Sequence, residues 1–170
     1  MKKQAILITA YKEVNTLSTL ITLFGENFNF YIHIDKKSNL STEGLDRFDN
    51  VFVSKKYKVN WGGFNHLKAI LHLSKEALKN NENTFFHLIT GEDFPIKSVK
   101  EFLALDQSKN YLDYFEVTDV HDVWFDRLNT FQFYDYFNAK IEKQLYYLSI
   151  IVRLQRKYKI NRSYSKSFPQ

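Results

Sequence analysis

The sequence is 170 residues long, of which 44% are hydrophobic, 25% charged and 17% aromatic, so it can bury the core of one globular domain. It has no cysteine, which excludes disulfides and thiolate metal sites. The net charge of +5 divides into +7 over residues 139–170 and −2 over the first 138 residues. This separation disfavours nucleic-acid binding, because the part of the chain that carries the motifs is slightly acidic.

The first half of the chain predicts alternating strands and helices. A buried strand is expected over Gln4–Ala10, an amphipathic helix over Glu13–Phe24 and a second strand over Phe28–Ile34. A short helix over Ser41–Phe48, capped by its first residue, and a short strand over Val51–Ser54 follow. The apolar N-terminal run is too short to span a membrane and lacks a cleavage site, so we expect no signal peptide and a cytoplasmic location.

The second half continues the pattern. A helix that runs to about Asn80 comes first, and then a strand over Thr84–Ile89, a short helix over Val99–Leu105, a strand over Tyr111–Val117 and a late helix over Ala139–Lys159. Strands that alternate with helices in this order predict an α/β fold, a mostly parallel sheet covered by helices.

Carboxylates follow two of the expected strands. Asp35 comes directly after the Phe28–Ile34 strand, and Gly91-Glu92-Asp93 follows the Thr84–Ile89 strand. In open α/β sheets, ligands bind beyond the carboxyl ends of the strands. These acids are therefore candidates for binding ribose or sugar hydroxyls, and Lys36 and Lys37 for facing phosphates. Ordinary polar turns are the alternative for both segments.

Trp61-Gly62-Gly63 stands just before a predicted helix. Paired glycines let the backbone approach a ligand and expose amides at the positive end of a helix, and an indole ring offers a flat apolar face for a sugar or a base. A helix-entry turn with a tryptophan in the core is the alternative. The sequence contains neither a P-loop nor G-x-G-x-x-G.

An acidic patch with one tryptophan and one arginine follows Tyr111. Carboxylates bind pairs of sugar hydroxyls and an indole packs on a sugar face, so the patch is a candidate carbohydrate-binding surface, with a solvated loop as the alternative. Neither H-E-x-x-H nor D-x-D occurs and the five histidines are interpreted as structural, so no metal site is predicted. The patch comprises Asp113, Glu116, Asp119, Asp122, Trp124, Asp126 and Arg127.

The late helix is basic and amphipathic. A helix of this kind usually packs on its own domain, and contact with an anionic membrane, at the inner face of the plasma membrane, is the alternative. Its expected apolar face consists of Leu145, Leu148, Ile151, Val152 and Tyr158.

Together these segments resemble a known family. In order and approximate spacing they are similar to the core-2/I-branching glycosyltransferases, which include β-1,6-N-acetylglucosaminyltransferases, peptide O-xylosyltransferases and bacterial relatives. Ala5 to Lys12 also resembles the family's first strand and loop, although a histidine is commoner where Tyr11 stands. The resemblance covers roughly the first 120 residues. The other matching segments are Ile32-His33-Ile34-Asp35-Lys36-Lys37-Ser38, Trp61-Gly62-Gly63-Phe64 and Thr90-Gly91-Glu92-Asp93-Phe94-Pro95-Ile96-Lys97-Ser98.

The resemblance implies a GT-A-like, Rossmann-like fold and an inverting transfer from a UDP-sugar without a metal or another cofactor. Asp113 falls where the family places an acceptor-binding acid, and we expect Glu116, Trp124 and Arg127 to extend that acceptor side. By position, the nucleotide site would be lined by Tyr11, Lys12, Asp35, Lys36, Trp61 and Gly62, and the donor sugar would be faced by Glu92 and Asp93.

The catalytic base is not assigned. In the family it is a glutamate of a downstream Asp-Glu motif, which takes the proton of the acceptor hydroxyl. We expect it beyond Gln170, with the fold incomplete at the C-terminus and the isolated chain poorly active or inactive. Residues 1–120 are then expected to form the UDP-sugar-binding half of the domain, and residues 121–170 an acceptor-side, basic helical segment.

The resemblance thus implies transfer of N-acetylglucosamine or a similar sugar from a UDP-sugar to a glycan or lipid-linked glycan, and we expect the protein to act in bacterial surface polysaccharide or glycolipid synthesis. The alternative is a non-catalytic nucleotide- or carbohydrate-binding module that keeps the fold without the base.

Overall fold

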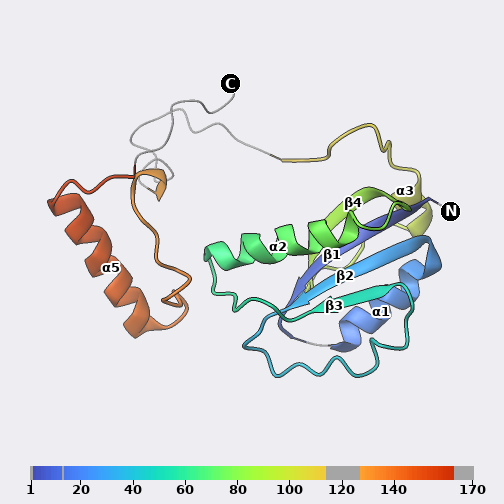
Figure 1. Ribbon diagram of the computed structural model, residues 1–170, viewed down its shortest axis with the longest axis horizontal. Helices are drawn as coiled ribbons and strands as arrows, with labels where there is room; N and C mark the ends of the chain where they lie inside the picture. Colours follow the sequence, from blue (N-terminus) through green and yellow to red (C-terminus); the bar gives the residue numbers. More distant parts are fainter. Residues whose placement is uncertain (1, 13, 114–126, 163–170) are drawn as a thin grey trace. The chain divides into compact units, whose positions relative to one another are not determined.

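The computed structural model describes residues 2–12, 14–113 and 127–162 (Figure 1). The chain divides into two compact units. The first comprises Met1–Val59 and Asn65–Asn110, and the second comprises Asn60–Phe64 and Tyr111–Gln170. The sheet lies in the first unit and the late helix in the second.

The first unit contains one sheet of four parallel strands, in the order β3-β2-β1-β4. The strands are β1 (Lys3–Ala10), β2 (Phe28–Ile34), β3 (Val51–Ser54) and β4 (Asn83–Thr90). The α/β fold predicted from the sequence is confirmed, and the parallel, helix-covered sheet is consistent with a GT-A-like fold.

Helices cover both faces of the sheet (Figure 1). On one face, α1 (Val14–Phe24) and α3 (Val99–Leu103) pack against alternate residues of β1 and β2. On the other, α2 (Phe64–Ala77) packs Leu73 and Ala77 against the residues in between. Side chains alternate across a strand, and burial on both faces therefore explains why all seven residues of β2 are buried.

Polar side chains within this core are hydrogen-bonded. The Asn29 Nδ2 donates to Asn83 Oδ1 at 2.7 Å, which ties β2 to the start of β4. The Gln4 side chain lies 2.7 Å from His87 Nε2. Buried polar groups without partners cost roughly 1–3 kcal/mol each, and these pairs avoid that cost.

One predicted element is wrong, and a second is contradicted over its first three residues. No residue from 41 to 48 is helical, and residues 43–47 form turns. Gly44 has a φ of +90°, and the Ser41 hydroxyl accepts the nearby Glu43 N–H at 3.1 Å, which holds a turn. Leu45 is fully buried and anchors this loop on the core. Of the strand predicted over Tyr111–Val117, residues 111–113 are not in a strand and are exposed, and the remainder lies outside the described residues.

The second unit contains α5 (Glu142–Lys157), which confirms the late helix with bounds a few residues inside those predicted. An acid in its first turn and two basic residues in its last turn complement the helix dipole. Its inner face buries Leu148 and Gln155. Among the helices that the structure describes, none combines the length and the apolar character that a membrane crossing requires.

Candidate functional site

The candidate site lies at the carboxyl edge of the sheet. Because the strands are parallel, the ends of β1, β2 and β4 meet there: Ala10 is in register with Ile34, and Thr9 with Thr90. The loops that leave this edge carry the predicted residues Tyr11, Lys12, Asp35, Lys36, Glu92 and Asp93. The structure thus brings six of the predicted site residues to one edge of the first unit.

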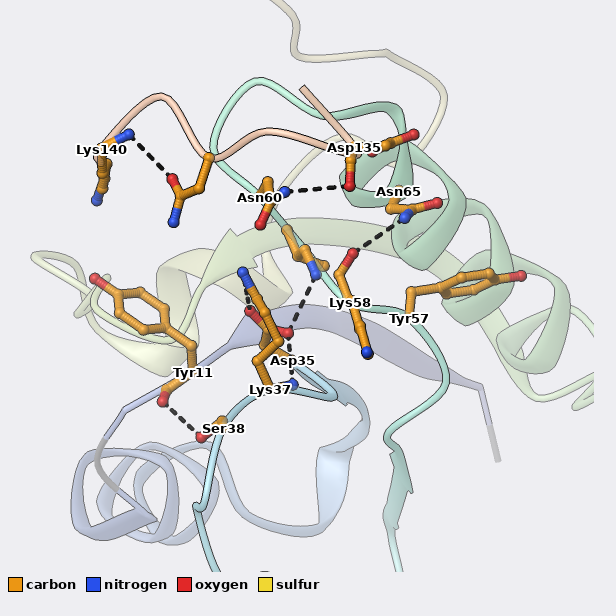
Figure 2. Close-up of polar contacts among 12 residues, drawn as sticks. Tyr11, Asp35, Lys37, Ser38, Tyr57, Lys58, Asn60, Asn65, Asp135 and Lys140 are labelled. Carbon is orange, nitrogen blue, oxygen red and sulfur yellow. Dashed lines mark hydrogen bonds and ion pairs between the residues drawn. The ribbon is translucent and has the colours of Figure 1, made fainter. Parts of the chain in front are cut away.

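Asp35 links the loops that follow β2 and β3 (Figure 2). Its Oδ1 accepts the N–H of Lys37 at 2.9 Å and that of Val59 at 3.1 Å, while Oδ2 lies 3.7 Å from Lys37 Nζ. The side chain is 13% exposed. One carboxylate oxygen therefore holds the backbone of both loops, and Oδ2 is the oxygen that a ligand hydroxyl would approach.

Two residues that sequence reasoning did not assign to the site complete this arrangement. Val59 supplies an N–H that donates to Asp35 Oδ1. The Ser38 hydroxyl donates to the Tyr11 carbonyl at 2.8 Å (Figure 2). The Ser38 oxygen also accepts the Leu40 N–H at 3.0 Å. Ser38 stood inside a motif that carried the family resemblance, whereas Val59 contributes only backbone and leaves no signal in the sequence.

Glu92 contacts two side chains in the loop that follows β1, Tyr11 and Lys12. Its Oε1 accepts the Tyr11 hydroxyl at 3.1 Å and lies 3.4 Å from Lys12 Nζ, which stands 4.8 Å from the centre of the Tyr11 ring. Hydrogen bonds with Tyr11 and Glu92 raise the pKa of Lys12 above its ordinary value. The exposed Lys12 ammonium is thus a fixed positive charge at neutral pH.

Asp93 differs from its neighbour. Its Oδ2 accepts the Thr90 N–H at 2.6 Å, and its own N–H donates to the Thr90 carbonyl at 3.2 Å, so it closes the turn at the end of β4. A Cβ at Gly91 would lie 2.8 Å from the Ala10 Cβ, so this turn requires glycine for close contact with the end of β1. The two adjacent acids therefore divide into one that pairs with Lys12 and one that shapes the turn.

Three histidines make hydrogen-bonding contacts with residues of the sheet or of the loops beside it. The Nε2 of His33 accepts the Tyr57 N–H at 3.0 Å, and burial lowers the pKa of His33. His66 contacts the Thr9 hydroxyl and His72 the Ser54 hydroxyl, both at 3.1 Å. The partners of the histidines among the described residues agree with their structural interpretation. His121 lies outside these residues.

The Trp61 turn belongs to the second unit. The Gly63 N–H donates to the Asn60 carbonyl at 3.0 Å, and Gly62 has a φ of +74°, which favours glycine. The Asn60 amide donates to the Tyr134 carbonyl at 2.9 Å. It also donates to the Asp135 carbonyl at 3.2 Å (Figure 2). Trp61 is 62% exposed, so the alternative of a core tryptophan is wrong.

Few of the predicted acceptor residues lie in the described chain. Asp113 and Arg127 are exposed, whereas Glu116 and Trp124 fall outside the described residues. Within residues 2–12, 14–113 and 127–162, no three His, Asp or Glu side chains gather closely enough to hold a metal ion.

Comparison with known proteins adds independent evidence. The model of the Core-2/I-Branching enzyme family matches residues 5–159. Over 114 residues the chain is 32% identical to "Probable beta-1,3-galactosyl-O-glycosyl-glycoprotein beta-1,6-N-acetylglucosaminyltransferase 7" from Sus scrofa, which covers 62% of this chain and 26% of that protein. Over 118 residues it is 31% identical to "Xylosyltransferase 2" from Rattus norvegicus, covering 63% of this chain and 14% of that protein. The chain thus spans about a quarter or less of the length of these relatives.

Proposed function

Because this chain belongs to the Core-2/I-branching enzyme family, we propose that it forms the donor-binding part of a glycosyltransferase that moves a sugar from a UDP-sugar to a glycan acceptor. The similarity to an N-acetylglucosaminyltransferase and to a xylosyltransferase supports the transferase class. The donor is N-acetylglucosamine or a similar sugar, and the transfer inverts the anomeric centre.

The observation that carries this proposal is the group of polar side chains at the carboxyl edge of the sheet. Asp35 Oδ2 would accept a ribose or base hydrogen bond, because its Oδ1 is held by the N–H groups of Lys37 and Val59. Ligands of open α/β sheets bind at such edges. Glu92 would face the donor sugar, and Asp93 would act through the turn that it closes.

Cationic side chains at this edge suit a diphosphate. Lys12, Lys36 and Lys37 lie within three residues after the ends of β1 and β2. Lys12 contacts Glu92 and the Tyr11 ring. Ammonium groups that compensate the charge on a departing UDP would take the part that a metal plays in other transferases. We therefore propose a metal-independent transfer in which the diphosphate draws Lys12 away from Glu92.

The acceptor in this proposal is a bacterial surface polysaccharide or glycolipid. Six Lys or Arg and no acid occur between residues 143 and 162, and basic helices contact anionic membranes or anionic glycans. The proposed location is the cytoplasmic face of the plasma membrane.

Titration calorimetry of the 170-residue chain with UDP and with UDP-N-acetylglucosamine, each with and without EDTA, tests the donor site. We expect UDP to bind equally well in both buffers. Asp35→Asn should weaken UDP binding and Lys97→Gln, a charge change on the segment before α3, should not. Absence of UDP binding would refute the donor site, and binding that EDTA abolishes would refute metal independence.

A further inference from the structure

The second unit carries an open groove that the proposed donor site does not use. The groove has a volume of about 240 Å³. Residues 131–134 line one side with Phe131, Phe133 and Tyr134, and α5 lines the other with Leu145, Leu148 and Val152. Its walls are therefore mainly aliphatic and aromatic.

Buried amide contacts fix the shape of this groove. Gln155, which is 5% exposed, accepts the Phe131 N–H at 2.8 Å and donates to the Phe131 carbonyl at 3.1 Å. Eleven positions earlier, Gln144 accepts the Asn138 N–H at 2.6 Å. Eleven residues make about three helical turns, so both glutamines lie on the same side of α5. The chain before α5 is thus pinned at two separated points, and the groove exists without a ligand.

Two arginines give the groove its charge. Arg153 and Arg156 both line it, and residues three apart on a helix are neighbours on one side. The sequence from residue 143 to residue 162, which covers most of α5, has six Lys or Arg and no acid. Guanidinium groups bind phosphate through paired, charge-assisted hydrogen bonds. An apolar channel with two guanidinium groups matches a ligand that joins a hydrocarbon chain to a phosphate.

We propose that this groove binds a lipid phosphate, with the phosphate at Arg153 and Arg156, the first carbons of the chain along Val152 and Leu148, and later carbons towards Leu145. The groove is larger than the roughly 150 Å³ that accommodates benzene, so several carbons fit. The inference rests on the proposed function and deepens it: the acceptor is a glycan joined to its lipid through phosphate, and this groove recognises the junction.

Alkyl phosphates of increasing length test the proposal. Calorimetry of the 170-residue chain with butyl, hexyl and octyl phosphate, all below micellar concentrations, should show affinity rising about three- to fourfold per methylene. The double variant R153Q/R156Q should bind octyl phosphate at least about tenfold more weakly, because charge-assisted contacts are lost. The matched variant K143Q/K157Q removes two charges from α5 outside the groove and should stay within about threefold of wild type.

A second variant leaves the charges in place. Ser149→Phe, which fills the groove, should remove the dependence on chain length. Inorganic phosphate binding as tightly as octyl phosphate would overturn the proposal, as would equal losses in the two double variants or equal binding of octyl glucoside. The double variant R153Q/R156Q should also bind anionic vesicles more weakly than wild type does. Equal binding of vesicles by the two proteins would mean that the basic residues contact the membrane surface in general, and it would overturn the proposal too. UDP titration reports on the donor site separately, so failure of the proposed function and failure of the groove are distinguishable.

Discussion

Replacing Asp35 should destabilise the carboxyl edge of the sheet as well as weaken ligand binding. In Asp35→Ala, the Lys37 N–H and the Val59 N–H lose their acceptor. The Lys37 amide is exposed and can bond water, whereas the Val59 amide is partly buried and costs about 1–3 kcal/mol without a partner. With the lost charge-assisted bonds, we expect a loss of about 2–3 kcal/mol in the free energy of unfolding.

Two matched variants separate the effect of the Asp35 hydrogen bonds on stability from the effect of its charge. Asp35→Asn keeps an oxygen for both amides and should cost about 1 kcal/mol, and Lys37→Ala removes only a partly exposed ion pair and should cost under about 1 kcal/mol. Urea unfolding followed by circular dichroism measures the free energy of unfolding of all three variants. In thermal unfolding, the midpoint temperature of Asp35→Ala should fall by roughly 4–12 °C. An Asp35→Ala variant within 0.5 kcal/mol of wild type, on the scale of ordinary surface substitutions, would refute the bridging role.

Three further predictions follow from contacts at the same edge. Gly91→Ala places a Cβ 2.8 Å from the Ala10 Cβ and should cost about 1–3 kcal/mol in urea unfolding; Ala10→Gly in the same chain should recover part of this loss, and strict additivity would contradict the contact. Burial lowers the pKa of His33 and His87 below 6.5, so the unfolded chain binds more protons, and the free energy of unfolding should fall from pH 7 towards about pH 5. His33→Gln should flatten that fall, because its side-chain oxygen can accept the Tyr57 N–H without titrating. Lys12→Gln should weaken UDP binding about fivefold at low salt, whereas Glu92→Gln, which releases the ammonium, should preserve or tighten it; equal losses in both would argue that the pair acts only as a structural bridge.

Sequence reasoning located the strands well where burial on both faces leaves a continuous apolar run. Phe28–Ile34 is the clearest case, because a fully buried parallel strand needs no polar residue facing water. The same reasoning failed at Ser41–Phe48, where a capping serine suggested a short helix but Gly44 adopts a left-handed backbone. Apolar periodicity reports which side chains are buried and does not report the backbone angles between them.

Within the site, the sequence identified candidate residues but did not indicate which contacts each of them makes. That Asp35 holds Val59 and that Asp93 closes its own turn depends on contacts that no spacing encodes. The groove beside α5 was also missed, because its defining contact joins Phe131 to Gln155 across 24 positions and a glutamine in a basic helix carries no signal. The predicted acceptor residues and the predicted division at residue 120 stay predictions.

The strand order has a consequence for synthesis of the protein. Strand β1 lies between β2 and β4, yet β4 begins at Asn83, long after β1 and β2 have been translated. Until then one edge of β1, whose apolar residues run from Ala5 to Ile8, offers unpaired backbone groups to any neighbouring chain. Slow passage of the ribosome between β3 and β4 would therefore lengthen the interval in which nascent chains can associate wrongly, and rapid translation of α2 and β4 would shorten it.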